Sequence, residues 1–441
     1  MEPKINDVFS NPEENDTVAV LVSIDLDDGT DVESSLKELE RLADTAGAKV
    51  AAYLVQSRER PDSATCIGKG KLLELNELCS NTGATLVIFD LELSPMQIRN
   101  VENALGEDVR VIDRTMLILD IFAKSAKTGE GMLQVEIAEL KYSIPRLIHS
   151  TKDLSRLGGG IGTRGPGESK LELDRRRARE RISALEHQLK ELENKRATQR
   201  KSREKSGIIQ IAIAGYTNAG KSTLLNNLTG ADILCADKLF ATLDPTTRRL
   251  RLPEAGEVLL TDTVGFVDRL PHHLVDAFKS TLDEVCYADL LLCVFDSSDP
   301  EILKRFNVTN EVIGDLFKRR GIPCAERINV FNQCDKPESK SVMSGFYLDS
   351  DCVKVSAVTG EGIEELLKLI EEKLKNKKRR VKFVFPPKDH GKLNYLYKTS
   401  TVENVEYDET ANAVVDAVCD ARTVGMYRQY LSEPDQSKEN E

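Results

Sequence analysis

One short segment holds the residues with the clearest chemical potential. Residues 215–222 read Gly-Tyr-Thr-Asn-Ala-Gly-Lys-Ser and match the pattern G-x-x-x-x-G-K-[ST]. The β-branched apolar run 208–214 predicts a buried strand before them, and residues 223–228 predict the start of a helix after them. This order directs backbone N–H groups and a positive helix N-terminus at phosphate oxygens. We therefore expect a nucleotide to be bound by Gly215, Tyr216, Thr217, Asn218, Ala219, Gly220, Lys221 and Ser222.

Two side chains of this phosphate-binding loop, the P-loop, have expected roles of their own. Lys221 would reach the β- and γ-phosphates of the nucleotide, and the hydroxyl of Ser222 would ligate Mg²⁺. We therefore expect Lys221 to be catalytic and Ser222 to be a metal ligand.

The segment after the P-loop helix contains candidate threonines for a nucleotide switch. A threonine in this region must close onto Mg²⁺ and the γ-phosphate if the site is to sense the nucleotide state. Residues 240–247 read Phe-Ala-Thr-Leu-Asp-Pro-Thr-Thr, so Thr242, Thr246 and Thr247 are all candidates. Spacing alone leaves the choice among the three open.

A predicted strand over residues 258–262 ends in the pattern D-x-x-G, formed by Asp262, Thr263, Val264 and Gly265. Asp262 would hold the hydration shell of Mg²⁺. The Gly265 N–H can approach the γ-phosphate because glycine has no side chain in the way. We therefore expect Gly265 to act directly on the reacting phosphate.

Two later segments predict which base is bound. The predicted strand 328–331 leads into Asn332, Gln333, Cys334 and Asp335, which resemble the guanine-reading element N-K-x-D. Asp335 would accept two N–H groups of guanine that adenine cannot offer, and leaving that carboxylate unpaired would be costly. After the strand 353–355, N–H groups of Ser356, Ala357 and Val358 could meet guanine O6. The ordered set predicts binding of GTP and GDP.

Two positions depart from the usual pattern of such sites. Gln333 stands where a lysine usually packs its stem over the base. Phe266 follows Gly265, where Ras-like proteins carry the glutamine that orients the attacking water. We therefore expect slow intrinsic hydrolysis and an external activator.

Composition limits the class of protein. A chain of 441 residues predicts several domains, and a net charge of −12 argues against non-specific coating of nucleic acid. We find no apolar run of membrane-spanning length and no leader pattern. The nine cysteines are scattered without a C-x-x-C pair, which predicts free thiols in a reducing cytoplasm.

The first part of the chain, well before the P-loop, alternates predicted strands and helices. Predicted strands at 18–24, 50–55, 85–89 and 109–112 alternate with helices at 34–46, after 71, and at 94–105, which predicts a small parallel sheet. The glycine loop 68–71 could bind an anion, but an ordinary turn between a strand and a helix is the simpler interpretation.

Two heptad runs follow this alternating region. Leu133, Ile137, Leu140, Ile144 and Leu147 share a 4-3-4-3 spacing with Ala178, Ile182, Leu185, Leu189 and Leu192. This period predicts an antiparallel helical hairpin, with Pro145 bending or ending the first helix. Packing of both helices on the neighbouring domains is the alternative.

The connection between the two runs is rich in glycine and arginine. Residues 158–167 contain six glycines, and residues 168–205 contain thirteen Lys and Arg against eight Asp and Glu. This segment is either a solvated mixed-charge helix or an RNA-phosphate surface at the tip of the hairpin.

Shifts in composition divide the chain into six parts. A basic linker at 376–380 precedes a predicted strand at 381–385, Pro386-Pro387 and a small α+β unit. We expect a flexible tail at 1–15, an N-terminal α/β domain at 16–125, a coiled-coil-like helical hairpin with a glycine-rich tip at 126–206, a Ras-like P-loop domain at 207–376, a small α+β C-terminal domain at 377–432 and a flexible tail at 433–441.

These motifs together resemble the HflX family of translational GTPases. The resemblance spans roughly residues 18–375 and is weaker beyond. The matching pieces are Asp113-Arg114-Thr115 with Ile121-Phe122-Ala123, the glycine-rich run 159–168, Asp174-Arg175-Arg176, the P-loop, the run 240–246, and Asp-Thr-Val-Gly-Phe at 262–266 with Leu270-Pro271-His272.

The resemblance implies further roles and partners. It favours Thr242 as the switch threonine, which makes Thr242 both catalytic and a metal ligand, and it implies nucleotide contacts from Phe240, Ala241, Leu243 and Asp244. It also implies a cytoplasmic, Mg²⁺-dependent GTPase that binds the RNA and protein of the large ribosomal subunit and splits or rescues ribosomes. We expect no DNA binding, no integral membrane association and a monomer. The alternative is a GTP-switched adaptor whose hairpin binds a protein.

Overall fold

The structure is a computed structural model of the whole chain, and it describes residues 17–27, 29, 31–146, 166–205, 208–230, 239–240, 245–266, 284–346, 349–374, 378–408 and 410–432. The chain divides into two compact units. The N-terminal unit comprises Met1–Leu192, Asp237–Leu243 and Arg269–Phe278, and the C-terminal unit comprises Glu193–Ala236, Asp244–Asp268 and Lys279–Glu441.

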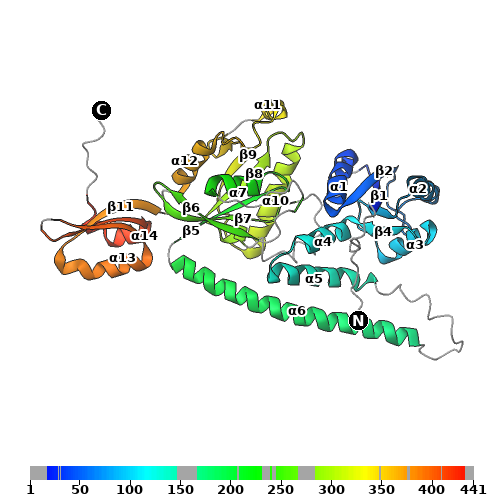
Figure 1. Cartoon of the computed structure of the whole chain (residues 1–441), viewed down its shortest axis with the longest axis horizontal. Helices are drawn as coiled ribbons and strands as arrows, with labels where there is room; N and C mark the ends of the chain where they lie inside the picture. The colour runs from blue at the N-terminus through cyan, green and yellow to red at the C-terminus, as the bar shows by residue number, and fades with distance from the viewer. Residues whose placement is uncertain are drawn as a thin grey trace. The chain divides into compact units, whose positions relative to one another are not determined.

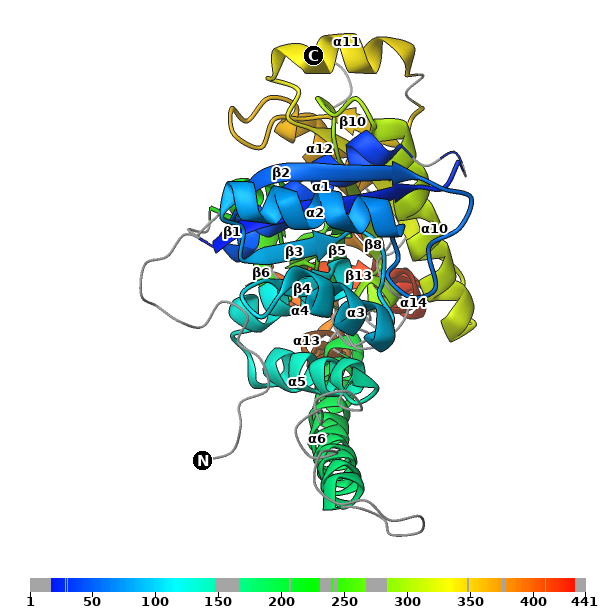
Figure 2. The ribbon, with the colours of Figure 1, turned by 90° about the vertical axis from the view of Figure 1, so that its right-hand side faces the viewer.

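The N-terminal unit is built on a parallel four-stranded sheet in the order β2-β1-β3-β4. The predicted strands are confirmed, and the helices between them cover both faces. α2 and α3 lie in front of the sheet in Figure 2, and α1 packs on the opposite face together with α4. The strands are β1 (Thr17–Asp25), β2 (Ala48–Ser57), β3 (Leu86–Phe89) and β4 (Arg110–Asp113), and the helices are α1 (Val32–Ala46), α2 (Lys69–Thr82), α3 (Pro95–Leu105) and α4 (Arg114–Ser125).

Local signals set the bounds of these helices. The Asp31 side chain accepts from the first-turn N–H groups of α1, and Gly47, at φ 94°, ends that helix in the left-handed region. Ser94 and Gln97 form a capping box at the start of α3. The Gly68 N–H, before α2, donates to the side-chain oxygen of Gln56 at 2.9 Å.

Helix α4 was not predicted from the sequence. A signal was present, since Asp113 caps the helix through the Met116 N–H at 3.0 Å and an apolar run follows. Arg114, at the first position of α4, is buried and pairs with Asp90 at 2.8 Å and Glu38 at 3.1 Å. This ionic cluster ties α4 to α1 and to the carboxyl end of β3.

The two heptad runs form helices α5 (Gly129–Ser143) and α6 (Pro166–Lys205). α5 ends two residues before Pro145, as predicted. The alternative, in which these helices pack on a neighbouring domain, holds in part for α5. This helix packs on α4 and buries Val135 and Ala138. Ion pairs of 2.8 Å from Arg181 to Glu136 and from Lys141 to Glu186 join it to α6 as well.

α6 is a single helix of 40 residues that belongs to the N-terminal unit up to Leu192 and to the C-terminal unit beyond (Figure 1). Because α6 begins at Pro166, Gly167 and Glu168 belong to a helix and not to the glycine-rich tip where we expected them. The rest of that tip, including Arg164, lies outside the described residues.

The C-terminal unit contains a six-stranded sheet in the order β10-β9-β8-β5-β7-β6, parallel except for the edge strand β6. Apolar runs in the sequence predict β5, β7, β8 (from residues 290–295), β9 and β10, but none predicts β6. The strands are β5 (Ile209–Gly215), β6 (Thr246–Leu252), β7 (Gly256–Asp262), β8 (Leu290–Asp296), β9 (Glu326–Asn332) and β10 (Cys352–Lys354). The helices are α7 (Lys221–Thr229), α10 (Ile302–Arg320), α11 (Pro337–Val342), continued by the short η2 (Met343–Gly345), and α12 (Ile363–Leu374).

The apolar runs that predicted these strands form the core of this sheet. Ile211, Leu260, Leu292 and Val330 are fully or almost fully buried on four neighbouring strands. Parallel strands place their carboxyl ends at one edge, so the residues that follow β5, β7, β8 and β9 are brought together there.

A small antiparallel sheet completes the C-terminal unit, in the order β11-β13-β12, and confirms the predicted α+β character. Phe383, Phe385 and Tyr427 form its aromatic core. Gly256 of β7, at φ 72°, packs against Val418. The elements are β11 (Lys378–Phe385), η3 (Pro387–Lys392), α13 (Leu393–Thr399), β12 (Thr401–Tyr407), β13 (Ala413–Asp420), α14 (Ala421–Met426) and η4 (Arg428–Tyr430).

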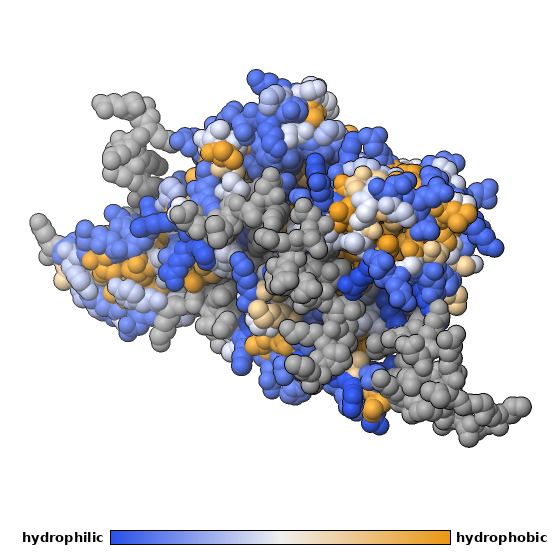
Figure 3. Space-filling model, turned by 45° about the vertical axis from the view of Figure 1, so that its right-hand side comes forward, coloured by the Kyte–Doolittle hydropathy of each residue, from blue (hydrophilic) through white to orange (hydrophobic). Residues whose placement is uncertain are grey.

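Among the coloured residues on the face seen in Figure 3, hydrophilic ones predominate. Across the described part of the chain, no helix is both long and apolar enough to cross a membrane. The eight cysteines in that part are all free thiols, as predicted.

Candidate active site

The P-loop connects β5 to α7, in the predicted context. Gly215, at φ 149°, lies so close to the backbone of Val294 that a Cβ would clash with its carbonyl oxygen. Gly220, at φ 84°, is packed in the same way against the Asn332 amide. Both glycines of the motif are therefore required by close approach and by backbone conformation.

Lys221 points back into the loop. Its Nζ donates to the Tyr216 carbonyl oxygen at 2.8 Å, and the side chain is buried. Burial lowers the pKa of Lys221 from its usual 10.5 to about 8, although the Asp262 carboxylate opposes this shift. An ammonium group held within the P-loop is suited to pair with phosphate oxygens.

The Ser222 hydroxyl lies beside the carboxylate at the end of β7. Its Oγ donates to Asp262 Oδ2 at 2.6 Å, and Asp262 is almost fully buried. A hydroxyl and a carboxylate at this distance are the hard oxygen ligands that Mg²⁺ prefers, either directly or through water. The residues present therefore fit the expected metal.

The D-x-x-G glycine lies directly beside the P-loop. A Cβ built on Gly265 would lie 2.9 Å from Lys221 Nζ and 2.6 Å from the Thr217 methyl carbon. No larger residue fits there without displacing those groups. The structure thus brings Gly265, Lys221 and Thr217 to one point.

Phe266 is held by the P-loop and cannot position a water molecule. Its N–H donates to the Gly215 carbonyl oxygen at 3.0 Å, and its carbonyl oxygen accepts from the Thr217 N–H at 2.8 Å. The side chain is buried. An apolar ring buried in the protein cannot orient a water molecule.

The N-x-x-D loop is linked to the P-loop by side chains. Asn332 donates to the Ala219 carbonyl oxygen at 2.9 Å and accepts from the Ala357 N–H at 2.9 Å. Gln333 donates to the Asn218 carbonyl oxygen at 3.1 Å. These contacts join three of the predicted segments into one site.

Three predicted positions of this loop cluster differ in exposure. Asp335 is exposed, so its carboxylate is accessible to a base, whereas Ser356 is fully buried and Val358 is largely exposed. The Cys334 N–H donates to the Val355 carbonyl oxygen at 3.1 Å, which holds the loop against the end of β10.

The structure describes two of the three candidate switch threonines. Thr246 and Thr247 are in β6, where they pair with Asp262 and Thr261 of β7, and the two hydroxyls of Thr247 and Thr261 are 3.0 Å apart. Ala241, Thr242, Leu243 and Asp244 lie outside the described residues. Phe240 belongs to the N-terminal unit.

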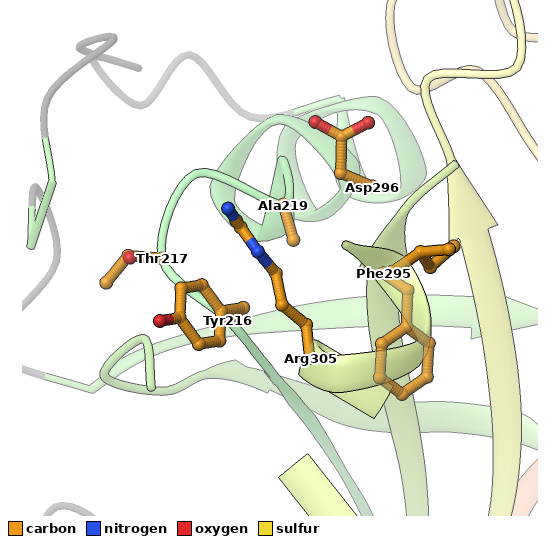
Figure 4. Close-up of a pocket in the computed structure, with 7 residues that line it drawn as sticks. Tyr216, Thr217, Ala219, Phe295, Asp296 and Arg305 are labelled. Atoms are coloured by element: carbon orange, nitrogen blue, oxygen red, sulfur yellow. The ribbon is translucent and has the colours of Figure 1, made fainter. Parts of the chain in front are cut away.

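One neighbour of the P-loop, Arg305 of α10, was not predicted from the sequence. The Arg305 guanidinium lies 4.5 Å from the centre of the Tyr216 ring and pairs with Asp299 at 2.8 Å. Figure 4 shows the pocket that Arg305 lines together with Phe295 and with Tyr216 and Thr217 of the P-loop. No local pattern signals this contact, because α10 and the P-loop are far apart along the chain.

A parallel sheet carrying a P-loop, a D-x-x-G loop and an N-x-x-D loop at one edge defines a P-loop GTPase. The chain is 51% identical over 391 residues to GTPase HflX of Caldanaerobacter subterraneus subsp. tengcongensis, covering 88% of this chain and 89% of that protein. It is 40% identical over 397 residues to GTPase HflX of Escherichia coli K12, covering 89% and 91%. The chain belongs to the HflX family of GTPases; it binds GTP and GDP and hydrolyses GTP.

Models of protein families match along most of the chain. They are described as GTP-binding GTPase N-terminal (33–123), GTP-binding GTPase Middle Region (125–203), 50S ribosome-binding GTPase (210–330) and HflX C-terminal domain (347–440). A solved GTP-binding protein from Sulfolobus solfataricus in complex with GDP aligns with 81% of this chain and 98% of its own, at 23% identity and a TM-score of 0.43.

Proposed function

We propose that this protein is a Mg²⁺-dependent GTPase of the cytoplasm that binds the large ribosomal subunit, is stimulated by it, and splits or rescues stalled or idle ribosomes. The observation that carries the proposal is the match of residues 210–330 to the family model described as 50S ribosome-binding GTPase. Buried Phe266 supports the need for an activator, since the usual water-positioning side chain is missing.

The proposed chemistry assigns roles to residues at the carboxyl edge of the sheet. Lys221 would pair with the β- and γ-phosphates, and the Gly265 N–H would donate to the γ-phosphate. Ser222 and Thr242 would hold Mg²⁺, with Asp262 acting through a water molecule. Bound there, Mg²⁺ would neutralise phosphate charge as GTP is cleaved. The remaining predicted contacts of residues 215–222, 240–244, 262–265, 332–335 and 356–358 belong to this proposed site.

The proposed contact with the ribosome uses α6 and the glycine-rich segment before it. The side chains of Arg176 and Arg177 on α6 are 67% and 69% exposed. Their partners, Glu180 and Asp174, are neighbours on the same exposed helix, at 3.6 and 4.0 Å. Such pairs contribute little, so these arginines can exchange them for RNA phosphates at small cost. We propose that α6 and the glycine-rich segment before it form an arm that contacts ribosomal RNA. We also propose the domain bounds given above.

Co-sedimentation with purified ribosomal subunits tests the proposal. The full chain is mixed with large or small subunits, with GDP or a non-hydrolysable GTP analogue, and GTP hydrolysis is measured in parallel. We expect pelleting with the large subunit that the GTP analogue strengthens, together with faster hydrolysis. A chain that stays in the supernatant with both subunits would support the adaptor function, in which the arm binds a protein.

A further inference from the structure

The side chain of Thr217, the third residue of the P-loop, has an unexplained hydroxyl. Thr217 is only 3% exposed, and its Oγ1 has no hydrogen-bond partner among the residues that the structure describes. Leaving a buried hydroxyl unpaired is unfavourable, because the group loses its hydrogen bonds to water without replacing them. Such a group in a binding loop points to a ligand that completes it.

The position of Thr217 indicates which part of the ligand this is. Its methyl carbon is the atom nearest to the place where a Cβ of Gly265 would lie, at 2.6 Å, and Lys221 Nζ is 2.9 Å from the same place. The proposed roles of Gly265 and Lys221 both concern the γ-phosphate. A side chain in contact with this point therefore lies beside the γ-phosphate of bound GTP.

The backbone of Thr217 is held in place by Phe266. The Thr217 N–H is already used, since it donates to the Phe266 carbonyl oxygen at 2.8 Å. Thr217 and Arg305 line one pocket, and in Figure 4 the Thr217 side chain points away from the Arg305 guanidinium. A rotation of about 120° about χ1 moves the hydroxyl to the staggered position that the methyl now occupies, so Oγ1 can reach the site of contact with Gly265.

We propose that Thr217 is a catalytic residue whose hydroxyl donates a hydrogen bond to a γ-phosphate oxygen of GTP. In the reaction, the oxygen of water bonds to the γ-phosphorus, and the bond to the β–γ bridging oxygen breaks with its electron pair going to GDP. The water proton goes to the phosphate product, and Thr217 keeps its own proton. Its hydrogen bond stabilises charge on the transferring group, which an N–H or hydroxyl in a dry site does strongly.

The proposal explains how a site with Phe266 retains hydrolysis. The glutamine that orients water elsewhere is replaced by a buried phenyl ring whose backbone is bound to the P-loop on both sides. Thr217 supplies a polar group beside the γ-phosphate, which the phenyl ring of Phe266 cannot supply. This inference rests on the roles proposed above for Lys221 and Gly265, but not on ribosome binding.

Two substitutions at this position separate the hydroxyl from the packing. Thr217→Val keeps the branched shape and removes the hydroxyl, and Thr217→Ser keeps the hydroxyl and removes the methyl. Single-turnover GTP hydrolysis by the full chain without ribosomes gives the rate, and titration with fluorescent GDP gives affinity for a ligand without a γ-phosphate. We expect Thr217→Val to slow hydrolysis about tenfold or more, Thr217→Ser to stay near the parent rate, and both to bind GDP like the parent.

Several results would overturn the inference. Hydrolysis by Thr217→Val at the parent rate would remove the hydroxyl from the reaction. Equal slowing in both variants, or equal loss of GDP binding, would assign Thr217 to loop packing only. Lys221→Ala, measured beside them, distinguishes failure of the site itself: if it too hydrolyses at the parent rate, the proposed phosphate site is wrong. If the parent chain does not co-sediment with ribosomal subunits, the proposed function is rejected, but the result on Thr217 still stands.

Discussion

The phenyl ring of Phe240 packs edge-on against that of Phe122, with the ring centres 4.5 Å apart and the planes at 65°. Both side chains are buried. The neighbouring Leu239 N–H donates to the Thr45 hydroxyl at 3.2 Å. The residue two positions before Thr242 is thus anchored in the N-terminal unit, and its φ of 57° is a conformation that phenylalanine adopts only when its surroundings impose it.

We expect the two rings to be energetically coupled in solution. Phe122→Ala alone should cost about 3–5 kcal/mol of stability, as for other buried phenylalanines. The double variant with Phe240→Ala should lose less than the sum of the two single losses, by about 0.5–1.5 kcal/mol, because the pair is removed once. Urea unfolding of the nucleotide-free chain, followed by circular dichroism, gives the free energy of unfolding of the parent, the two single variants and the double variant. Additive losses would mean that the rings do not meet.

Asp335→Asn should change which base the site prefers. Xanthine carries an oxo group where guanine carries its amino group, so an amide donor suits it better than a carboxylate. Competition of GTP, XTP and ATP against fluorescent GDP compares the parent with the variant. We expect the parent to exclude ATP and the variant to shift toward XTP. Equal affinity of the parent for ATP and GTP would refute the role of Asp335.

Lys221→Ala and Ser222→Ala should abolish GTP hydrolysis. The first removes the charge that pairs with phosphate, and the second removes a proposed Mg²⁺ ligand that lies 2.6 Å from Asp262. Lys221→Met, which fills the space of the aliphatic stem, is the matched control and should be equally inactive. Phosphate release is measured over a range of Mg²⁺ concentrations. Turnover by Lys221→Ala at the parent rate would place the activity elsewhere.

Gln333→Lys should tighten nucleotide binding. The Gln333 amide already donates to the Asn218 carbonyl oxygen at 3.1 Å, so a lysine can keep that contact and adds a cation and a longer apolar stem over the base. Gln333→Ala, which loses the contact, should weaken binding by about 0.5–1.5 kcal/mol. Fluorescent GDP titration compares the three proteins. An affinity of Gln333→Lys equal to or below that of the parent would show that glutamine is a sufficient substitute.

Replacing the arginines of the arm should weaken binding to the large ribosomal subunit. Each phosphate contact releases counterions, so binding by the parent should fall steeply with salt, and the variant should show a shallower slope. Intrinsic GTP hydrolysis should change little, because the P-loop is on another part of the chain. The variant carries alanine at Arg164, Arg175, Arg176 and Arg177.

A control for lost charge removes the same number of exposed basic residues from β6 and α10. If this control lowers binding as much as the arm variant does, net charge and not the arm is responsible. Normal binding of the arm variant at moderate salt would contradict the RNA-probe role. The control carries alanine at Arg248, Arg249, Arg251 and Lys318.

The sequence alone determined the parts of the site that depend on short stretches of chain. The P-loop with its flanking β5 and α7 follows from a local motif and from runs of apolar residues, and so do the strand ends at Asp262 and Asn332. Parallel strands separated by helices must bring their carboxyl ends to one edge, so the convergence of these segments also followed.

The tertiary structure decided what depends on contacts between distant segments. The link from Gln333 to Asn218, the burial of Phe266 and the position of Arg305 over Tyr216 are invisible to periodicity and spacing. The same holds for the docking of Phe240 on Phe122 and for the packing of α5 on α4, where a heptad pattern could not say which face meets which partner. Such contacts depend on how whole elements pack, and a local pattern records only that a residue is apolar or polar, not which distant residue it will touch.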